Sequence, residues 1–197
     1  MSTKSMLLLS VDVGITNFAY SLLSVNLNRG IQFEWHSLTL VEWRLINLHV
    51  SAQHATGRAK PMVCDYIDAM RRELSLTVDI SELTAVVIEN QMRNPCKIIA
   101  HALYTHITSL VPHVLVGFCS AQLKLQCTIS PFKQKKKHRG PPTSKAQRKK
   151  NAVKLVVSMF DEKIKFGVAN QLYWNQQPKK DDLADSLLQI IRILQLL

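Results

Sequence analysis

The stretch SMLLLSVDVGITNFAYSLLSVNL (residues 5–27) decides the fold class. Its first part is an apolar run that ends at Asp12 and Gly14, which predicts a buried strand followed by a turn. Residues 17–27 have the composition of a second strand and predict its hairpin partner. Apolar and polar residues alternate over residues 31–40, which predicts a third strand. The chain is therefore expected to open with three antiparallel strands.

Helices and strands are predicted to alternate further along the chain. Helical spacing is found at residues 62–74, 96–111 and 144–160, the last with Ser144 as its cap, and again in the closing segment 178–197. Short buried strands are predicted at 83–90, which contains Glu89, and at 113–120. Residues 51–60 are predicted to form a loop and 161–178 to be irregular. This order predicts an α/β domain with a mixed sheet and helices on both faces.

The 197 residues are enough for one domain with a full core, so a single domain over residues 1–197 is expected. The net charge is +11, and its distribution is uneven. Residues 90–160 contain no Asp or Glu and hold 13 of the 25 Lys and Arg residues. A basic loop is predicted at about 131–143, where proline, glycine and lysine are concentrated. Such a region favours a polyanionic partner, and nucleic acid in particular, over an ordinary solvated surface.

Acidic residues occupy special places in the predicted elements. Asp12 and Glu89 lie at the ends of buried strands, while Asp182 and Asp185 are three residues apart on the closing helix and so share one face. Asp181 lies four residues before Asp185 and competes for that role. Each acid alone has an ordinary explanation: a turn residue, an ion pair of Glu89 with Arg93, or a favourable charge at a helix N-terminus.

The combination of these acids indicates a metal site. Buried carboxylates with no paired cations need metal ions to neutralise them. Ligand sets made only of oxygen select hard cations such as Mg²⁺ or Mn²⁺. Four acids suit two ions about 3.5–4 Å apart, as in nucleases that cut phosphodiesters. The sequence thus predicts Asp12, Glu89, Asp182 and Asp185 as metal ligands and catalytic residues.

The remaining signals concern redox state and targeting. The four cysteines are widely spaced and form no C-x-x-C pair, which argues against a zinc site or a disulfide framework. The N-terminal apolar run, residues 6–9, is too short for a secretory signal, and the apolar tail is too short to cross a bilayer. No membrane association and no secretion are therefore expected, and no mitochondrial presequence is visible in this sequence.

Three motifs in order, VDVGITNFAYSLL, VVIENQMR and KKDDLADSLLQI, resemble the RNase H-fold Holliday-junction resolvases. The resemblance is strongest to the mitochondrial resolvases of fungi and their relatives in large DNA viruses, and more distant to bacterial RuvC. It implies an RNase H-like fold with a mixed five-stranded sheet. It also implies a homodimer, Mg²⁺ or Mn²⁺ at the four acids, and paired symmetric incisions across a four-way DNA junction. The compartment that it implies is a mitochondrion or a virus-infected host cell.

Basic residues are the expected DNA contacts. Phosphate contacts fix position without carrying sequence information. Arg93 and Lys180, beside the acids, are candidates for holding the scissile strand, with internal ion pairs as the alternative. The predicted set is Arg93, Lys135, Lys136, Lys137, Arg139, Lys149, Lys150 and Lys180.

Three other functions share parts of this pattern. The DVGITN segment also resembles the first phosphate loop of the actin, Hsp70 and sugar-kinase ATPases, but the chain has only six glycines, none adjacent, and is too short for two such lobes. An RNase H-fold nuclease that acts on flaps or RNA–DNA hybrids shares the metal site and stays open. A non-catalytic nucleic-acid-binding protein of this fold also stays open, although the presence of all four acids favours an enzyme.

Overall fold

The computed structural model describes residues 4–27, 37–122, 127, 144–162 and 164–196. The elements, in chain order, are β1 (Lys4–Asp12), β2 (Phe18–Leu27), β3 (Leu38–Ile46), α1 (Leu48–Thr56), α2 (Val63–Thr77), the short 3₁₀ helix η2 (Ile80–Glu82), β4 (Ala85–Glu89), α3 (Cys96–Leu110), β5 (Leu115–Cys119), α4 (Lys145–Glu162), β6 (Lys165–Phe166), α5 (Val168–Gln176) and α6 (Asp181–Leu194).

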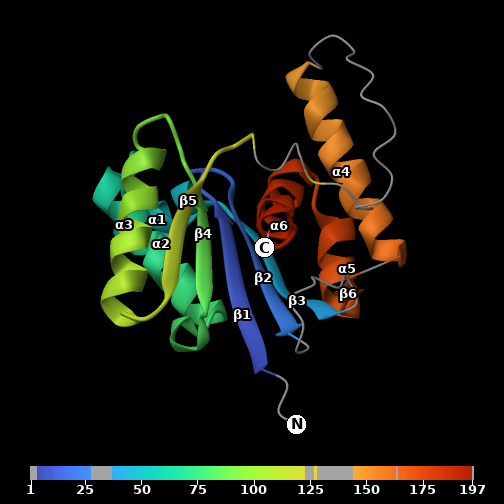
Figure 1. Cartoon of the computed structure of the whole chain (residues 1–197). Coiled ribbons are helices and arrows are strands. Elements are labelled where there is room, and N and C mark those ends of the chain that lie inside the picture. The colour runs from blue at the N-terminus through green and yellow to red at the C-terminus, as the bar shows by residue number, and fades with distance from the viewer. Residues whose placement is uncertain (1–3, 28–36, 123–126, 128–143, 163, 197) are drawn as a thin grey trace.

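One sheet in the order β5-β4-β1-β2-β3-β6 runs through the molecule (Figure 1). β1, β2 and β3 pair antiparallel, as the opening stretch predicts. β4 pairs parallel to β1, and β5 parallel to β4. The mixed α/β class is confirmed, but the predicted count of five strands is wrong. A sixth strand, β6, pairs parallel to β3 through two residues, too few to leave a pattern in the sequence.

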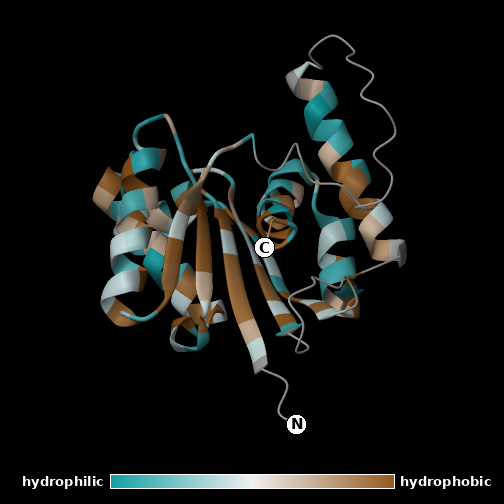
Figure 2. Ribbon diagram, in the orientation of Figure 1, coloured by the Kyte–Doolittle hydropathy of each residue, from teal (hydrophilic) through white to brown (hydrophobic). Residues whose placement is uncertain are grey.

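Each face of the sheet is covered by helices and buries its own core (Figures 1 and 2). Neighbouring residues of a strand point to opposite faces, so Leu9 packs with α1, α2 and α3 while Leu8 packs with α4, α5 and α6. The predicted placement of helices on both faces is therefore confirmed. No helix in the described part of the chain is long and apolar enough to cross a membrane.

The closing helix, α6, is fixed on the sheet by buried polar contacts as well as apolar ones. Ser186 Oγ lies 2.7 Å from Ser21 Oγ on β2, and the indole Nε1 of Trp43 on β3 donates to Leu183 O at 3.0 Å. Apolar side chains of α6 fill the rest of the interface. These contacts set both the depth and the rotation of α6 against the sheet.

Two local predictions are wrong. Residues 51–60, predicted as a loop, lie partly in α1, which buries only Leu48 and Ala52 and so leaves little apolar pattern. The segment 161–178, predicted to be irregular, contains β6 and α5, whose Trp174 stacks on Trp43 with ring centroids 4.7 Å apart. The third strand, predicted at 31–40, is present at Leu38–Ile46, and residues 28–36 lie outside the described part.

Candidate active site

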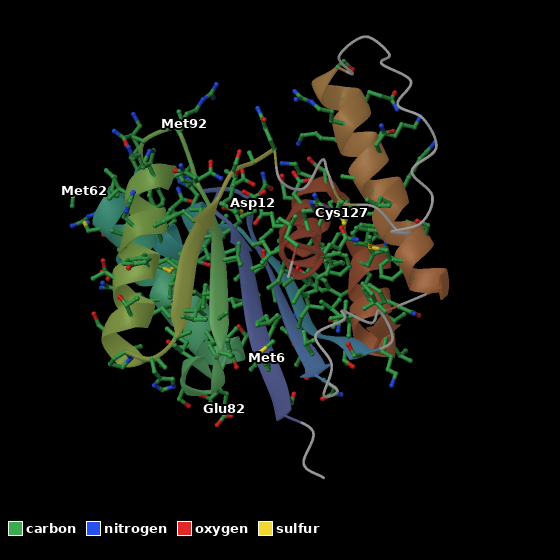
Figure 3. The ribbon with its side chains drawn as sticks, in the orientation of Figure 1. Met6, Asp12, Met62, Glu82, Met92 and Cys127 are labelled. Carbon is green, nitrogen blue, oxygen red and sulfur yellow. The ribbon has the colours of Figure 1, made fainter. Side chains whose placement is uncertain are left out.

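Two of the predicted acids lie at the carboxyl ends of neighbouring parallel strands, and so at the same end of the sheet. Val11 on β1 and Ile88 on β4 are register partners, and Asp12 and Glu89 are the residues that follow them. Because side chains alternate, Asp12 shares the face of Ser10, which contacts α6. Figure 3 shows Asp12 at this end of the sheet, far from Met6 and Glu82, which lie toward the other end. The parallel pairing of β1 and β4 thus brings the two carboxylates together.

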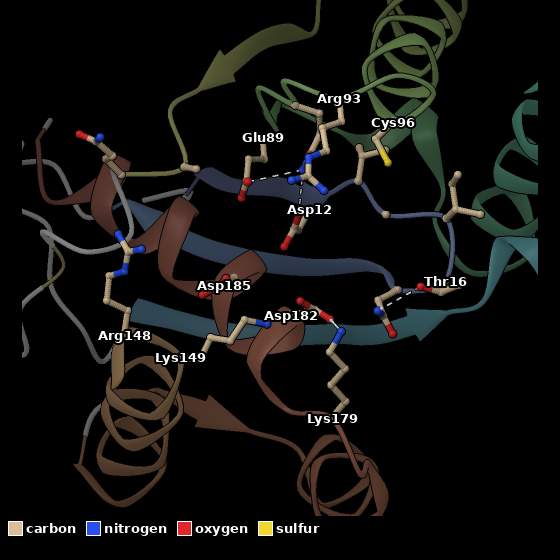
Figure 4. A pocket seen from close by; sticks show the side chains of 17 residues that line it. Asp12, Thr16, Glu89, Arg93, Cys96, Arg148, Lys149, Lys179, Asp182 and Asp185 are labelled. Carbon is tan, nitrogen blue, oxygen red and sulfur yellow. Dashed lines mark hydrogen bonds and ion pairs between the residues drawn. The ribbon is translucent and has the colours of Figure 1, made fainter. Parts of the chain in front are cut away.

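The other two acids come from the first turns of α6. Asp182 and Asp185 are three residues apart and face the same pocket as Asp12 and Glu89 (Figure 4). This pocket has a volume of about 680 Å³. It is lined by Asp12, Val13, Gly14, Ile15, Thr16, Asn17, Glu89, Gln91, Arg93, Cys96, Ala121, Gln122, Arg148, Lys149, Lys179, Asp182 and Asp185. All four acids singled out in the sequence therefore line one site.

Gln91 connects the two strand-end acids. Its side-chain nitrogen Nε2 lies 3.1 Å from Asp12 Oδ1 and 3.4 Å from Glu89 Oε1. The carboxylates of Asp12 and Glu89 are thus close enough to share one amide group. Glu89 is buried, and its second oxygen Oε2 accepts a hydrogen bond of 2.6 Å from Gln189 Nε2 on α6. The amides hold Glu89 from both sides.

A lysine neutralises one acid of α6. Lys179 Nζ lies 2.7 Å from Asp182 Oδ2, and the Asp182 side chain is only 15 % exposed. The premise that these acids have no paired cations is therefore wrong. The four carboxylates share the pocket with Arg93, Arg148, Lys149 and Lys179.

Asp181 is engaged elsewhere. It forms an ion pair with Lys149 of α4 and does not line the pocket. Burial alone would raise the pKa of Asp181, but the hydrogen bond and charge of Lys149 outweigh it, so this pKa is lowered. Burial likewise opposes the charge of Lys149, but the hydrogen bond to Asp181 and the charges of Asp181, Asp182 and Asp185 raise the pKa of Lys149. The pair remains ionised and links α4 to the start of α6.

The turn between β1 and β2 forms one wall of the pocket. A Cβ atom at Gly14 would lie 2.6 Å from the carbonyl oxygen of Asn17, so only glycine fits this close approach. Cys96 lies on another wall. Burial raises the pKa of its thiol, and the charge of Asp12 raises it further, while hydrogen bonds with the backbone oppose this. Cys96 therefore stays protonated and is a poor nucleophile.

The predicted DNA contacts have different positions. Arg93 and Lys149 line the pocket, whereas Lys150 is exposed on α4 outside it. The ammonium of Lys180 lies over the Trp174 ring, 5.7 Å from its centroid, and Lys180 does not line the pocket. The basic loop at about 131–143, with Lys135, Lys136, Lys137 and Arg139, lies outside the described residues.

The sequence analysis did not single out several polar residues that line the pocket or contact its acids, among them Gln91, Arg148, Lys179 and Gln189. Two of them could have been found from their distance along the chain to an acid. Gln91 follows Glu89 by two residues, and Gln189 follows Asp185 by four. Lys179 and Lys180 are adjacent in the sequence. Only the backbone just before α6 decides which of these two lysines reaches Asp182.

The acids of the pocket are ligands of the type that a metal ion needs, but they do not lie at the distances that would hold one. Among the described residues, no three His, Cys, Asp or Glu side chains lie close enough together to hold a metal ion. The four acids nevertheless offer only oxygen ligands, which suit hard divalent cations. Nitrogen donors of Gln91 and Lys179 lie beside these oxygens, where a cation would compete with them. Metal binding would require both side chains to withdraw.

The sheet order, with helices on both faces, is that of an RNase H-like fold, and acids from β1, β4 and α6 line one pocket of it. Residues 8–94 match the family model described as "Mitochondrial resolvase Ydc2 / RNA splicing MRS1". This match includes Asp12 and Glu89, covers less than half of the chain and ends before α6. No curated protein sequence matches the chain.

Solved resolvase structures share the whole fold. The yeast mitochondrial Holliday junction resolvase Ydc2 aligns with a TM-score of 0.56 at 19% identity, over 95% of this chain and 78% of its own. Thermus thermophilus RuvC aligns with a TM-score of 0.57 at 11% identity, over 97% of this chain and 96% of its own. The same RuvC in complex with Holliday junction substrate gives 0.55 at 12% identity, over the same shares. The predicted resemblance and the RNase H-like fold are confirmed.

Proposed function

We propose that this chain is a structure-selective endodeoxyribonuclease that resolves four-way DNA junctions by paired, symmetric hydrolysis of phosphodiesters. The observation that carries the proposal is the convergence of Asp12, Glu89, Asp182 and Asp185 from three elements at one pocket. The family model, which names a mitochondrial resolvase, and the structural likeness to two resolvases support it. Of these, T. thermophilus RuvC is a protein with a structure in complex with Holliday junction substrate.

The four acids would hold divalent cations, Mg²⁺ or Mn²⁺, and we propose two ions per site. Such ions, when bound, activate a water and stabilise the charge of the phosphate and the leaving oxygen. Glu89 is already oriented by Gln189, and Asp182 and Asp185 are fixed by the docking of α6. The protein's contribution is thus a set of carboxylate oxygens at one pocket, where a cation would displace the nitrogen donors of Gln91 and Lys179.

Cationic side chains around the acids would bind the DNA backbone. Arg93 and Arg148 are exposed at the pocket, one after β4 and the other on α4 (Figure 4). Guanidinium groups bind phosphate through two parallel hydrogen bonds, so these two arginines suit the strands that flank the cut. Lys150 and the lysines of the basic loop would extend this surface along the junction arms.

The proposed enzyme would act as a homodimer, because two symmetric cuts need two sites. The edge of the sheet at β5, with α3 beside it, is the face that we assign to the second copy. β5 exposes Leu115 on one side of the sheet and Phe118, next to Tyr104 of α3, on the other side. The rings of Tyr104 and Phe118 stack with centroids 5.7 Å apart, and this aromatic pair is the proposed centre of the dimer contact.

A charge on this face tests the assignment. Leu115, 72% exposed, would be replaced by glutamate, with Leu76→Glu as the matched control because Leu76 is 74% exposed on α2. Sedimentation equilibrium should give a dimer for the wild type and the control, and a monomer for Leu115→Glu. A dimeric Leu115→Glu variant would place the second copy elsewhere.

Two other functions remain to be separated from junction resolution. A nuclease for flaps or RNA–DNA hybrids would use the same acids. A non-catalytic nucleic-acid-binding protein is favoured by two observations. Nitrogen donors lie beside the acids, and the family description also names RNA splicing. The compartment, a mitochondrion or a virus-infected cell, stays an expectation from the resemblance.

The deciding experiment is a cleavage panel with Mg²⁺ or Mn²⁺ on a four-way junction, a duplex, a flap and an RNA–DNA hybrid. Junction resolution predicts paired nicks at symmetric positions in the four-way junction, with ends that can be religated. Preferred cutting of the flap or hybrid would support the other nuclease. Tight binding to the junction without cutting would support the non-catalytic protein.

A further inference from the structure

A glutamine joins the three elements that carry the site acids. Gln189 lies on α6, four residues after Asp185, and its side chain is fully buried. Its carbonyl oxygen Oε1 accepts a hydrogen bond of 3.2 Å from Ser10 Oγ on β1, and its Nε2 donates one of 2.6 Å to Glu89 Oε2 on β4. A buried amide is costly unless it is hydrogen-bonded, and these contacts satisfy both of its ends.

The carboxylate of Glu89 accepts only, so it requires the NH₂ end of the amide, and the serine holds the opposite end. Ser10 is fully buried, two residues before Asp12 on the same face of β1. Its hydroxyl holds the carbonyl end of Gln189 and leaves the NH₂ end directed at Glu89. Glu89 Oε2 is thereby held inside the protein, while Oε1 lies on the side of Gln91 and the pocket. The orientation of Glu89 therefore depends on Gln189.

Attachment of the helix does not depend on this contact alone. Ser186, also fully buried on α6, reaches Ser21 on β2 at 2.7 Å and donates to Leu183 O at 2.9 Å. Ser186 does not line the pocket. Trp43 of β3 also donates to Leu183 O of α6. Of these buried polar contacts between α6 and the sheet, only that of Gln189 reaches a site acid. Ser186 is consequently a natural control for a purely structural effect.

We propose that Gln189 is a positioning residue for Glu89, fixed in turn by Ser10, so that one carboxylate oxygen is presented to the pocket at a set angle. This inference rests on the proposed function, in which Glu89 is a metal ligand. Partners that orient a ligating carboxylate are worth about 10- to 100-fold in metal affinity or activity. Replacing Gln189 should therefore weaken the affinity for the metal ion even in the absence of DNA.

The test is calorimetric titration of the full chain with Mn²⁺ in the absence of DNA, together with thermal unfolding in EDTA. Gln189→Met keeps the volume and removes both hydrogen bonds. We expect its apparent Kd for Mn²⁺ to rise about 10-fold or more. Excess Mn²⁺ should restore part of its cleavage rate on the four-way junction. Ser186→Ala should lower the melting temperature yet leave the Kd within about twofold of the wild type, since the hydrogen bonds that it removes, with Ser21 and Leu183, do not reach a site acid.

Ser10→Ala keeps the inference testable if Gln189→Met fails to fold. It leaves Gln189 in place but removes the hydrogen bond that holds its carbonyl end, and we expect the Kd to rise about 2- to 10-fold, the worth of one hydrogen bond. An unchanged Mn²⁺ affinity in a folded Gln189→Met, or in Ser10→Ala if the former does not fold, overturns the inference. A wild type that binds no Mn²⁺ contradicts the proposed function itself, which separates the two failures.

Discussion

Lys179 Nζ and Asp182 Oδ2 lie 2.7 Å apart, and the ion pair joins the residue just outside α6 to its first turn. Lys179 is thus a built-in competitor for the oxygen that we assign to a metal ion. It is 42% exposed, so its ammonium group can move toward a phosphate when the carboxylate is taken by a cation. Lys179 would thus pair with Asp182 in the absence of metal and with a DNA phosphate once the metal is bound.

Replacing Lys179 by glutamine should separate these two roles. Without the competing ammonium, we expect the Kd for Mn²⁺ in the absence of DNA to fall about 2- to 5-fold, in line with the small worth of a partly exposed ion pair. Junction affinity at low salt should fall as well. Lys180→Gln is the matched control, because Lys180 lies over Trp174. A weaker Mn²⁺ affinity in Lys179→Gln would contradict the competition.

Neutralising the site acids should stop cleavage and spare binding. We expect Asp12→Asn and Asp185→Asn to reduce the rate of junction cleavage at least about 100-fold, because each removes a proposed metal ligand. Gel-shift affinity for the junction in EDTA should be unchanged or higher. Asp181→Asn, which alters an acid outside the pocket, should keep most of its activity. Substantial nicking by Asp12→Asn would reject the assignment of the acids.

The basic loop should set the salt dependence of binding. Replacing Lys135, Lys136 and Lys137 by glutamine should weaken binding to junctions of any sequence. The slope of log K against log salt should become shallower by about 0.9 for each phosphate that the loop no longer neutralises. Lys60→Gln, an exposed lysine between α1 and α2, is the control. An unchanged slope in the triple variant would show that the loop stays off the DNA.

The pair of Asp181 and Lys149 should stabilise the fold over a broad pH range. The folded pKa of Asp181 is lowered from 3.8, so its contribution is present above that value and is lost as the pH falls through the folded pKa. The pKa of Lys149 is raised from 10.5, so its contribution is lost as the pH rises through the still higher folded value. Between these limits the contribution is constant.

Asp181→Asn should therefore lower the melting temperature at pH 7 by up to about 4 °C, the effect of an ion pair worth about 1 kcal/mol in a chain of this size. Well below pH 3.8 the variant and the wild type should melt together. Scanning calorimetry across pH measures both. Asp68→Asn, which alters an exposed pair with Arg71, should not shift the melting temperature. A difference that persists in acid would point to packing instead of charge.

The sequence predicts the parts of the fold that have strong periodicity. β1, β4 and α6 are apparent from their apolar patterns, and the positions of Asp12 and Glu89 follow from parallel pairing. α1 is not apparent, because a nine-residue helix that buries only Leu48 and Ala52 has too few apolar positions. β6 has two residues, so only its contact with β3 defines it as a strand.

Prediction of the site is limited in a different way. The acids can be found because their spacing places them at strand ends and on one helix face. Their partners cannot, because Gln189 and Glu89 are 100 residues apart in the chain and meet only through packing of α6 on the sheet. The choice between Lys179 and Lys180 is likewise made by three-dimensional structure.

Two of the four acids enter the pocket from α6, which follows all the strands of the sheet in chain order. A ribosome therefore completes the sheet and the basic helix α4 before it supplies the final carboxylates. Under the proposed function, a chain that stopped ahead of α6 would lack Asp182 and Asp185, and it would also lack the helix that fills one face of the core. Truncation at this point should therefore remove cleavage and stability together.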